Sequence, residues 1–503
     1  MKRALKFQAD DNVVVALEDL KAGDVLSING EETDICVCDD LPQGHKVAVC
    51  AVKAGEEIQK YGHIIGTATV DIPKGGYVHV HNVQDTITDW RGNIKHDYDP
   101  AGVKEISDEF LLENPPKLTG YRRKDGSVGF RNYLLVVSTG VCGNQPVDDL
   151  KVRLRDYKDI VCITNPSGCV ILPNDRKMQN DMLLGLARNP NVGAVIFVGL
   201  GCEAVVADEL YKAVKDEKPA AYFISHHFSS CDEATNELEK KALELREIIN
   251  AQEREEVSVA DIRIGVQCGA SDTGGTTAAA ANPAIGYCSD LIVKNGGISV
   301  LGETCGWFGG EQTMVRQSRT KEVADSIVSL MGRIYDHCLF YGRRIEEANP
   351  APGNIAGGIT TLCEKALGNT RGGTAPIEGV LEIGGQPAGS GLYVADNPGL
   401  DATSVFAQTM SSCNVILYST GRGSPVGTPI APVVKLTASP TAASVFGAHM
   451  DVILTDLVLE GKPISEGGWR LFNKVVEVCN GTPSIAEAHG HREYSFPMMM
   501  GPM

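Results

Sequence analysis

Two histidines one residue apart, His79 and His81, lie in residues 77–82 of this 503-residue chain. In an extended segment, successive side chains alternate between two faces, so a strand here would turn both imidazoles to the same side. Imidazoles placed in this way can bind one metal ion or one anionic substrate. We interpret the pair as a clamp presented to an active site elsewhere in the chain. The alternative is two surface histidines on a hairpin.

Cysteines beside glycines form a second pattern. Each follows a short apolar run that ends in a glycine-containing turn: Cys142, Cys169, Cys202 and Cys268. Thiolates bind soft metal ions and iron–sulfur clusters, so neighbouring strand ends could hold such a group, with Glu303 as a further ligand. A second candidate set, His45 and the two clamp histidines with a carboxylate, suits Fe²⁺ or Mn²⁺. The alternative for the cysteines is apolar packing at crowded turns.

Three further residues have the chemistry of a site that binds a hydroxy acid. Lys365 follows the turn Gly357–Thr361, where burial would lower its pKa and make it a base. Arg422 lies between two glycines and suits bidentate carboxylate binding. Asp272 lies at a predicted strand end, where it could bind substrate or a metal ion. The alternatives are a surface lysine, a turn cation and a helix cap, respectively. A second pair, His489 and His491, is either a solvated tail or part of a neighbour's site in an oligomer.

The net charge and composition of the chain exclude several functional classes. A net charge of -18 argues against nucleic acid or an anionic membrane as the partner, but allows a small anionic substrate. The 15 cysteines include no CxxC motif, the N-terminus lacks an apolar signal core, and no apolar run is long enough to cross a membrane. We therefore expect a cytoplasmic protein with reduced thiols. A chain of this length should form two or three domains.

The elements that must position these residues fall into segments. Residues 1–83, which we call the N-terminal module, alternate short apolar runs with glycine turns and predict a small β-rich domain. Its motif apolar-x-Lys-x-Gly is repeated. Residues 84–118 are polar and predict a linker with a short helix. Residues 119–256 and 257–503 alternate apolar strands with helices, which predicts two α/β domains with mostly parallel sheets. One long helix is expected over 311–346. In such sheets ligands bind at the carboxyl ends of strands.

The sequence resembles the altronate/galactarate dehydratase family of sugar-acid hydro-lyases over nearly its whole length. The motifs that carry the resemblance are Gly44-His45-Lys46, Lys60-Tyr61-Gly62, His79-Val80-His81-Asn82, Gly199-Leu200-Gly201-Cys202-Glu203, Cys268-Gly269 with Ser271-Asp272, Gly357-Gly358-Ile359-Thr360-Thr361 and Ser419-Thr420-Gly421-Arg422-Gly423. The resemblance identifies the N-terminal module as SAF-type. It implies substrate binding by the following residues: Lys46, His81, Asn82, Asn165, Asp272 and Arg422. It also implies a metal-dependent lyase with catalytic His45, His79 and Lys365, and it leaves both of the metal sets above open.

The activity implied by the family is β-elimination of water from a sugar acid such as altronate or galactarate, giving a 2-keto-3-deoxy acid. The same superfamily contains 3-sulfolactate sulfo-lyase, in which the SAF module is a separate subunit, so sulfite release is the first alternative. The ending Glu487–Glu493 resembles that branch. Asn165 stands where dehydratases resemble one another in placing a histidine, which supports a second alternative, a non-catalytic sugar-acid-binding member. We expect a homo-oligomer.

Overall fold

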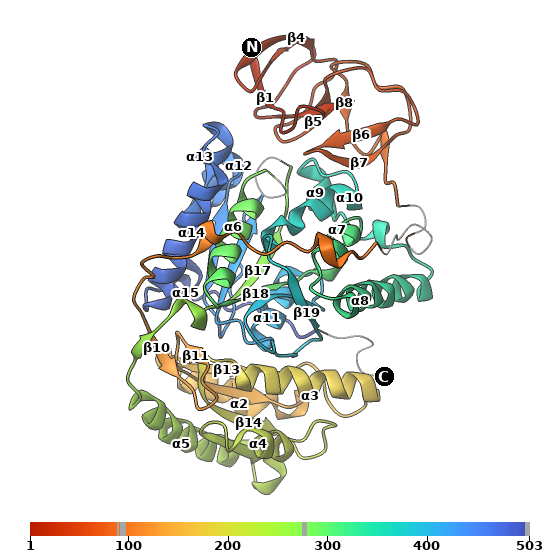
Figure 1. Cartoon of the computed structure of the whole chain (residues 1–503). Helices are drawn as coiled ribbons and strands as arrows, with labels where there is room; N and C mark the ends of the chain where they lie inside the picture. Colours follow the sequence, from red (N-terminus) through yellow and green to blue (C-terminus); the bar gives the residue numbers. More distant parts are fainter. Residues whose placement is uncertain (88–89, 91–96, 274–278, 498–503) are drawn as a thin grey trace.

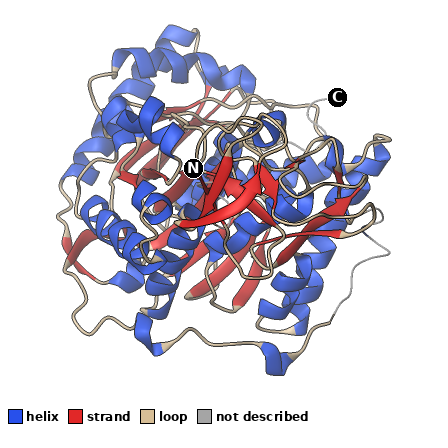
Figure 2. Cartoon of the chain, turned by 90° about the horizontal axis from the view of Figure 1, so that it is seen from above, coloured by secondary structure: helices blue, strands red, loops and turns tan. Residues whose placement is uncertain are grey.

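The computed structural model describes residues 1–87, 90, 97–273 and 279–497. It shows a β-rich N-terminal module followed by two α/β domains, which confirms the predicted fold class. In Figure 1 the third domain lies between the N-terminal module at the top and the second domain at the bottom. Seen from above, helices surround the strands of the parallel sheet (Figure 2). The third domain is therefore the one that can contact both of the others.

The N-terminal module contains a six-stranded sheet of order β4-β3-β1-β2-β5-β8 and a three-stranded sheet of order β6-β7-β9. The repeated motif forms the same turn twice, with left-handed Gly23 and Gly55 and with Lys21 and Lys53 paired to aspartates. This internal repeat therefore places two equivalent turns in the module. The strands are β1 (Lys2–Leu5), β2 (Val13–Ala16), β3 (Val25–Ile28), β4 (Glu31–Cys36), β5 (Lys46–Ala48), β6 (Glu57–Lys60), β7 (His63–Ala68), β8 (Tyr77–Val78) and β9 (Val83–Gln84).

The second domain is built on a parallel four-stranded sheet of order β13-β12-β14-β15. Apolar strands are covered on both faces, by α2 and α5 on one side and by α3 and α4 on the other. A small antiparallel sheet, β11-β10-β16, lies beside it. The strands are β10 (Leu118–Arg122), β11 (Val128–Gly129), β12 (Tyr133–Ser138), β13 (Ile160–Ile163), β14 (Val192–Gly199), β15 (Ala220–Ile224) and β16 (Glu255–Val257). The helices are α2 (Asn144–Arg153), α3 (Pro173–Arg188), α4 (Ala207–Val214) and α5 (Cys231–Asn250).

The third domain has a parallel seven-stranded sheet of order β19-β20-β18-β17-β21-β22-β23. Its strands are β17 (Arg263–Gly269), β18 (Ile298–Leu301), β19 (Ile377–Leu381), β20 (Gly391–Ala395), β21 (Val415–Thr420), β22 (Val433–Thr437) and β23 (Val452–Ile453). Its helices are α6 (Ala281–Lys294), α7 (Glu311–Gln317), α8 (Lys321–Phe340), α9 (Pro352–Ala356), α10 (Leu362–Ala366), α11 (Asp401–Met410), α12 (Pro440–Phe446), α13 (Thr455–Leu459), α14 (Ile464–Cys479) and α15 (Ile485–His489).

The prediction of one helix over 311–346 is wrong, because the chain breaks between α7 and α8. Arg319 donates its backbone N–H to the carbonyl of Ile377, the first residue of β19, and Thr320 caps α8 by accepting from the N–H of Val323. These bonds separate α7 from α8 at residues 318–320. Helix α4 begins at Ala207, after the loop that Glu203 holds, as described below.

The segment predicted as a linker packs on the third domain where it is described. Trp90 is buried against Phe308 and Tyr335, and Phe110 is buried against Tyr287. Among the described residues of this segment, Trp90 is helical, and Pro100–Gly102 and Asp108–Phe110 form 3₁₀ turns. None of the helices in the described part of the chain has the length and apolar character needed to cross a membrane.

Candidate active site

A buried cluster of three charges joins the N-terminal module to the third domain. Glu364 on α10 lies 2.9 Å from Nζ of Lys46 on β5 and 2.7 Å from Nζ of Lys60 at the end of β6. The same carboxylate accepts hydrogen bonds from the backbone N–H and hydroxyl of Thr360. Lys46 also donates to the carbonyl of Gly358. The contact therefore docks the module on the carboxyl-end loops of the seven-stranded sheet.

Burial and charge shift the titration of this cluster in opposite directions. Burial alone would raise the pKa of Glu364, but the ammonium groups of Lys46 and Lys60 hold it well below its usual range. Burial lowers the pKa of Lys46 to about 8, with Glu364 opposing the shift. Lys46 was expected to bind substrate, whereas its ammonium group is fully buried and engaged by protein atoms. Its observed contacts are those of an interdomain anchor.

The two clamp histidines do not share the face of a strand, so that prediction is wrong. Strand β8 ends at Val78, and His79 and His81 lie in a turn that Asn82 closes by accepting from the N–H of His79 and donating to the carbonyl of Tyr77. His79 is buried and His81 is exposed. Both rings nevertheless contact the ring of Tyr77, at centroid distances of 5.5 and 5.2 Å. The side chain of Asn82, expected to bind substrate, is used within the turn.

His45 and His79 form the inner part of this aromatic group. Their ring centroids are 4.8 Å apart, and Nδ1 of His45 lies 2.6 Å from the hydroxyl of Tyr77. Nε2 of His45 lies 3.2 Å from the carbonyl of Ala356, at the turn before α10. Burial, followed by the charge of Lys46, lowers the pKa of His79 to about 4. Nδ1 of His79 is buried and has no hydrogen-bond partner among the described residues. His79 is therefore a neutral imidazole with a free nitrogen.

Lys365, the residue after Glu364, points into the third domain. Its Nζ donates to the hydroxyl of Ser271 at 3.0 Å and lies 3.3 Å from Oε1 of Glu303. Oε2 of Glu303 pairs with Arg371 at 3.0 Å. Burial alone would lower the pKa of Lys365, but Glu303 and Cys268 together raise it. The expected lowering is thus reversed, because the buried ammonium group has carboxylate and thiol neighbours.

The residues around Lys365 come from neighbouring strand ends. Cys268, on β17, lies 2.8 Å from the hydroxyl of Ser271. Glu303 follows β18 with a left-handed φ of 67°, an uncommon backbone state for a residue with a side chain. Asp401, at the start of α11, accepts a hydrogen bond from Tyr418 on β21 at 2.8 Å. Burial, and then the charge of Glu303, raises the pKa of Asp401 to about 6.

Sequence reasoning missed Asp401, Glu364 and Lys60 as site residues. The contact around Asp401 explains a nearby glycine, since a Cβ at Gly269 would clash with Tyr418 and Asp401. Two residues that were expected do lie at this edge of the sheet. A Cβ at Gly421 would contact Asp272, and the exposed Arg422 donates to the carbonyl of Gly353 at 3.2 Å.

The four cysteines divide between two domains. Cys142, Cys169 and Cys202 line one small cavity at the carboxyl ends of the second domain's strands, together with Gly140, Gly143 and Gly168. Their thiols are free and exposed, and solvation loss followed by the nearby Cys169 raises the pKa of Cys202. Glu203 fixes the loop by accepting from the backbone N–H groups of residues 200–202. Cys268 and Glu303 belong to the third domain, so the structure does not bring them into this group.

Asn165 lies beside the three-thiol cavity in a group of unpaired polar atoms. Its Oδ1 accepts from the N–H of Ser167, and its Nδ2 is buried without a partner among the described residues. The same holds for both carboxylate oxygens of Asp175 and for Oε1 of Gln179, which line a cavity with it. Asp175 and Gln179 were not foreseen, because nothing in their sequence context distinguishes them from other helix residues.

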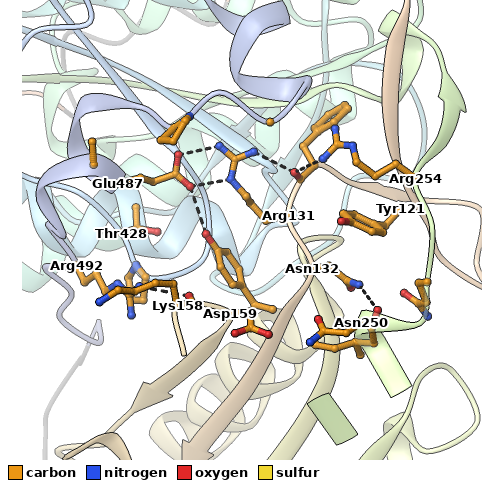
Figure 3. A pocket seen from close by; sticks show the side chains of 18 of the residues that line it. Tyr121, Arg131, Asn132, Lys158, Asp159, Asn250, Arg254, Thr428, Glu487 and Arg492 are labelled. Atoms are coloured by element: carbon orange, nitrogen blue, oxygen red, sulfur yellow. Dashed lines mark hydrogen bonds and ion pairs between the residues drawn. The ribbon is translucent and has the colours of Figure 1, made fainter. Parts of the chain in front are cut away.

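A larger cavity, of about 610 Å³, lies between the second and third domains. Figure 3 shows Arg131 facing Glu487, whose carboxylate is 2.8 Å from the guanidinium and 3.2 Å from the hydroxyl of Tyr133. Tyr133 is the first residue of β12, so the cavity faces the amino ends of those strands. Ligands of open parallel sheets bind at the carboxyl ends. The cavity therefore does not lie where the active site of an open parallel sheet is expected.

Comparison with known proteins agrees with this architecture. Three family models match the chain in order: the altronate/galactarate dehydratase SAF domain at residues 2–86, the D-galactarate dehydratase/altronate hydrolase second domain at 120–250, and the D-galactarate/altronate dehydratase C-terminal domain at 259–500.

Named relatives align over most of the chain. Altronate dehydratase of Bacillus subtilis (strain 168) is 33% identical over 451 residues, covering 87% of each chain. Altronate dehydratase of Escherichia coli (strain K12) is 31% identical over 501 residues, covering 97% of each. The beta subunit of (2R)-sulfolactate sulfo-lyase of Chromohalobacter salexigens is 30% identical, covering 75% of this chain and 95% of its own. The chain therefore belongs to the altronate/galactarate dehydratase family and is an enzyme of the lyase class.

Proposed function

We propose that the chain removes water from a sugar acid such as altronate or galactarate and forms a 2-keto-3-deoxy acid. The observation that carries the proposal is a pair of groups on the two sides of the buried contact between the N-terminal module and the third domain. One is the neutral pair His45 and His79 of the SAF-type module, and the other is the charged group of Lys365 and Glu303. The relatives named as altronate and galactarate dehydratases support this substrate class.

The reaction needs a base at C2 and an acid at C3. The proton at C2, next to the carboxylate, is weakly acidic, and its removal gives an enediolate. We assign the base to His79, because its imidazole is neutral and Nδ1 is free. Departure of the C3 hydroxyl with a proton releases water and leaves an enol, which tautomerises to the 2-keto acid. Asp401 has the raised pKa of about 6 that suits the proton donor.

Positive charge is needed to hold the substrate and to stabilise the enediolate. Lys365 remains protonated because its pKa is raised, so we assign its ammonium group to charge stabilisation rather than to proton removal. Arg422 and Asp272, on adjoining loops, are suited to bind the carboxylate and hydroxyl groups of the substrate. His45 keeps the adjacent imidazole in place through their ring contact and its own bonds to Tyr77 and Ala356.

Metal dependence is part of the proposal. The free thiols of Cys142, Cys169 and Cys202 line one cavity, and this donor set suits an iron–sulfur cluster. Glu303 is less suited to an ion, because both of its carboxylate oxygens are paired with cations. A bound Lewis-acidic metal centre would supply charge neutralisation at substrate oxygens. We further propose a homo-oligomer located in the cytoplasm.

The proposal is tested by assaying 2-keto acid release from a panel of hydroxy acids, using anaerobically purified protein supplied with Fe²⁺ or Mn²⁺. Turnover of an aldonate or aldarate is the expected result. Saturable binding of these acids with no turnover of any would refute it and favour the non-catalytic alternative.

Sulfite release from 3-sulfolactate is the second candidate function. It is favoured by the match to the sulfo-lyase beta subunit over 95% of that subunit. Sulfite leaves as a stable anion and needs little acid assistance, so this reaction would not require Asp401. Measuring sulfite in the same panel separates the two candidates.

A further inference from the structure

Three histidines far from the SAF-type contact in sequence converge near the C-terminus of the chain. His449 lies in the 3₁₀ turn that follows α12, His489 ends α15, and His491 follows two residues later. One ring nitrogen from each lies within 4.8 Å of the others. In the described part of the chain, no other group of three His, Cys, Asp or Glu side chains brings its ligand atoms within this distance of one another. Two remote segments therefore present imidazoles to one point.

The ring arrangement leaves ligand atoms available. The centroids of His449 and His489 are 5.2 Å apart with the rings nearly perpendicular, and those of His449 and His491 are 5.5 Å apart at 80°. Nδ1 of His449 is buried and has no hydrogen-bond partner among the described residues. Phe446 stacks on the other side of His449 at 4.4 Å and fixes its ring. An unpartnered buried nitrogen is costly unless a ligand takes it up.

A carboxylate supports the third ring as in many metal sites. Nδ1 of His491 lies 3.1 Å from Oε1 of Glu493, which directs Nε2 of the ring away from that bond. The other oxygen of Glu493 accepts the backbone N–H of Gly427. Metal-bound histidines commonly donate their second nitrogen to a carboxylate, which sets the tautomer and raises the ligand's basicity. The arrangement therefore includes both a ligand set and its support.

The surrounding charges permit binding of a cation. Lys435 is the nearby basic group, and its Nζ is turned to the carbonyl of Pro425 at 2.8 Å. His489 is exposed and the other two are half-buried, so an ion can enter from solvent.

We propose that His449, His489 and His491 bind a divalent transition-metal ion. Three imidazoles suit Zn²⁺, Co²⁺, Ni²⁺ or Fe²⁺ better than Ca²⁺ or Mg²⁺, which prefer oxygen. Three protein ligands leave the remaining coordination positions to water or an exogenous group. The ion would join α15 to the connection between α12 and β23. This site goes beyond the proposed function, since it requires neither the sugar acid nor the thiol set.

The test is Co²⁺ binding by the full-length, reduced protein after chelator treatment, followed by calorimetry and visible absorption. We expect ligand-field bands in the wild type. In His489→Ala and His449→Ala these bands should be lost and the affinity should fall at least about tenfold, whereas Glu493→Gln should weaken binding by about 10- to 100-fold. The matched control is His63→Ala, which removes an exposed histidine of β7 and should leave binding unchanged.

A second measurement uses the unaltered chain and does not depend on how the variants fold. Carbethoxylation of each histidine is followed by mass spectrometry with and without Co²⁺. The ion should slow modification of His449, His489 and His491 but not of His63. Unprotected histidines, or Co²⁺ bands that survive in both histidine variants, would overturn the proposal. Thiolate charge-transfer bands in the near ultraviolet that appear without histidine protection would place the ion on cysteines and overturn it equally. Because no substrate is used, failure here is distinguishable from failure of the dehydratase proposal.

Discussion

Replacing Glu364 by glutamine should release the SAF-type module from the third domain. The carboxylate is fully buried and is the partner of both Lys46 and Lys60, at 2.9 and 2.7 Å. Breaking a buried ion pair by removing one partner costs about 3–5 kcal/mol, because it leaves an uncompensated charge. Here two buried ammonium groups lose their partner, so we expect a loss of docking free energy at the upper end of that range.

Docking is measured by hydrogen exchange of the β5 amides, together with urea unfolding. In Glu364→Gln, exchange should accelerate by the factor that corresponds to the lost free energy. The control is Glu18→Gln in the same module, whose pair with Lys2 is about one-third exposed and should contribute at most about 1 kcal/mol. Equal protection in wild type and Glu364→Gln would refute the assignment of the three-charge cluster as the interdomain anchor.

The dependence of stability on pH gives an independent measurement on the same cluster. The pKa of Glu364 lies below its usual 4.5, so below about pH 4.5 the unfolded chain binds more protons at this group than the folded chain. The stabilisation from Glu364 is therefore present above that pH and is lost as the pH falls further. Glu364→Gln should lack this part of the acid slope. An unchanged slope would show that the carboxylate is not ionised in the folded protein.

Further predictions concern catalysis and the metal centre. Lys365→Met should lower kcat by about 10²- to 10³-fold, as loss of a charge-stabilising group does, with an unchanged circular dichroism spectrum; normal turnover would contradict its role. If His79 is the base, the acid limb of kcat/KM should lie near pH 4, where the imidazole protonates, and an acid limb near 6.5 would argue against it. Asp401→Asn should slow dehydration by about 10²- to 10⁴-fold but leave any sulfite release nearly unaffected, so equal loss of both would contradict the acid assignment. Cys202→Ser should reduce bound iron and acid-labile sulfide, measured on anaerobic protein, whereas the exposed Cys231→Ser should not; equal metal content in the two would remove the cluster proposal.

The sheet architecture was predictable because its signals are local. The core strands of the parallel sheets are short apolar runs such as Leu134–Val137, and most of them, although not β19 or β21, are followed by a helix. Boundaries failed where a single side chain intervened. The expected helix over 311–346 is broken by the Thr320 cap, which starts a second helix.

The site was predictable only in part, because its contacts join residues distant in the sequence. Spacing placed His79 and His81 on one strand face, whereas Asn82 ends the strand and separates their environments. A lowered pKa was expected for Lys365 from its burial alone. The opposing effect of Glu303 could not be foreseen, because that residue follows a different strand. No local pattern marks His449 as a partner of the C-terminal histidine pair, because that contact exists only after α12 and α15 have packed.

The anchor on Glu364 has a consequence for how the two parts of this enzyme associate. The sulfo-lyase relatives carry alpha and beta subunits as separate proteins, whereas here a single polypeptide contains both the SAF-type module and the body. A covalent connection replaces subunit concentration by an effective concentration, about millimolar for a short connection. The module of this chain can therefore undock and return without being lost to dilution. The association of separate subunits depends on protein concentration. Docking of this module does not, because the module and the body belong to one chain.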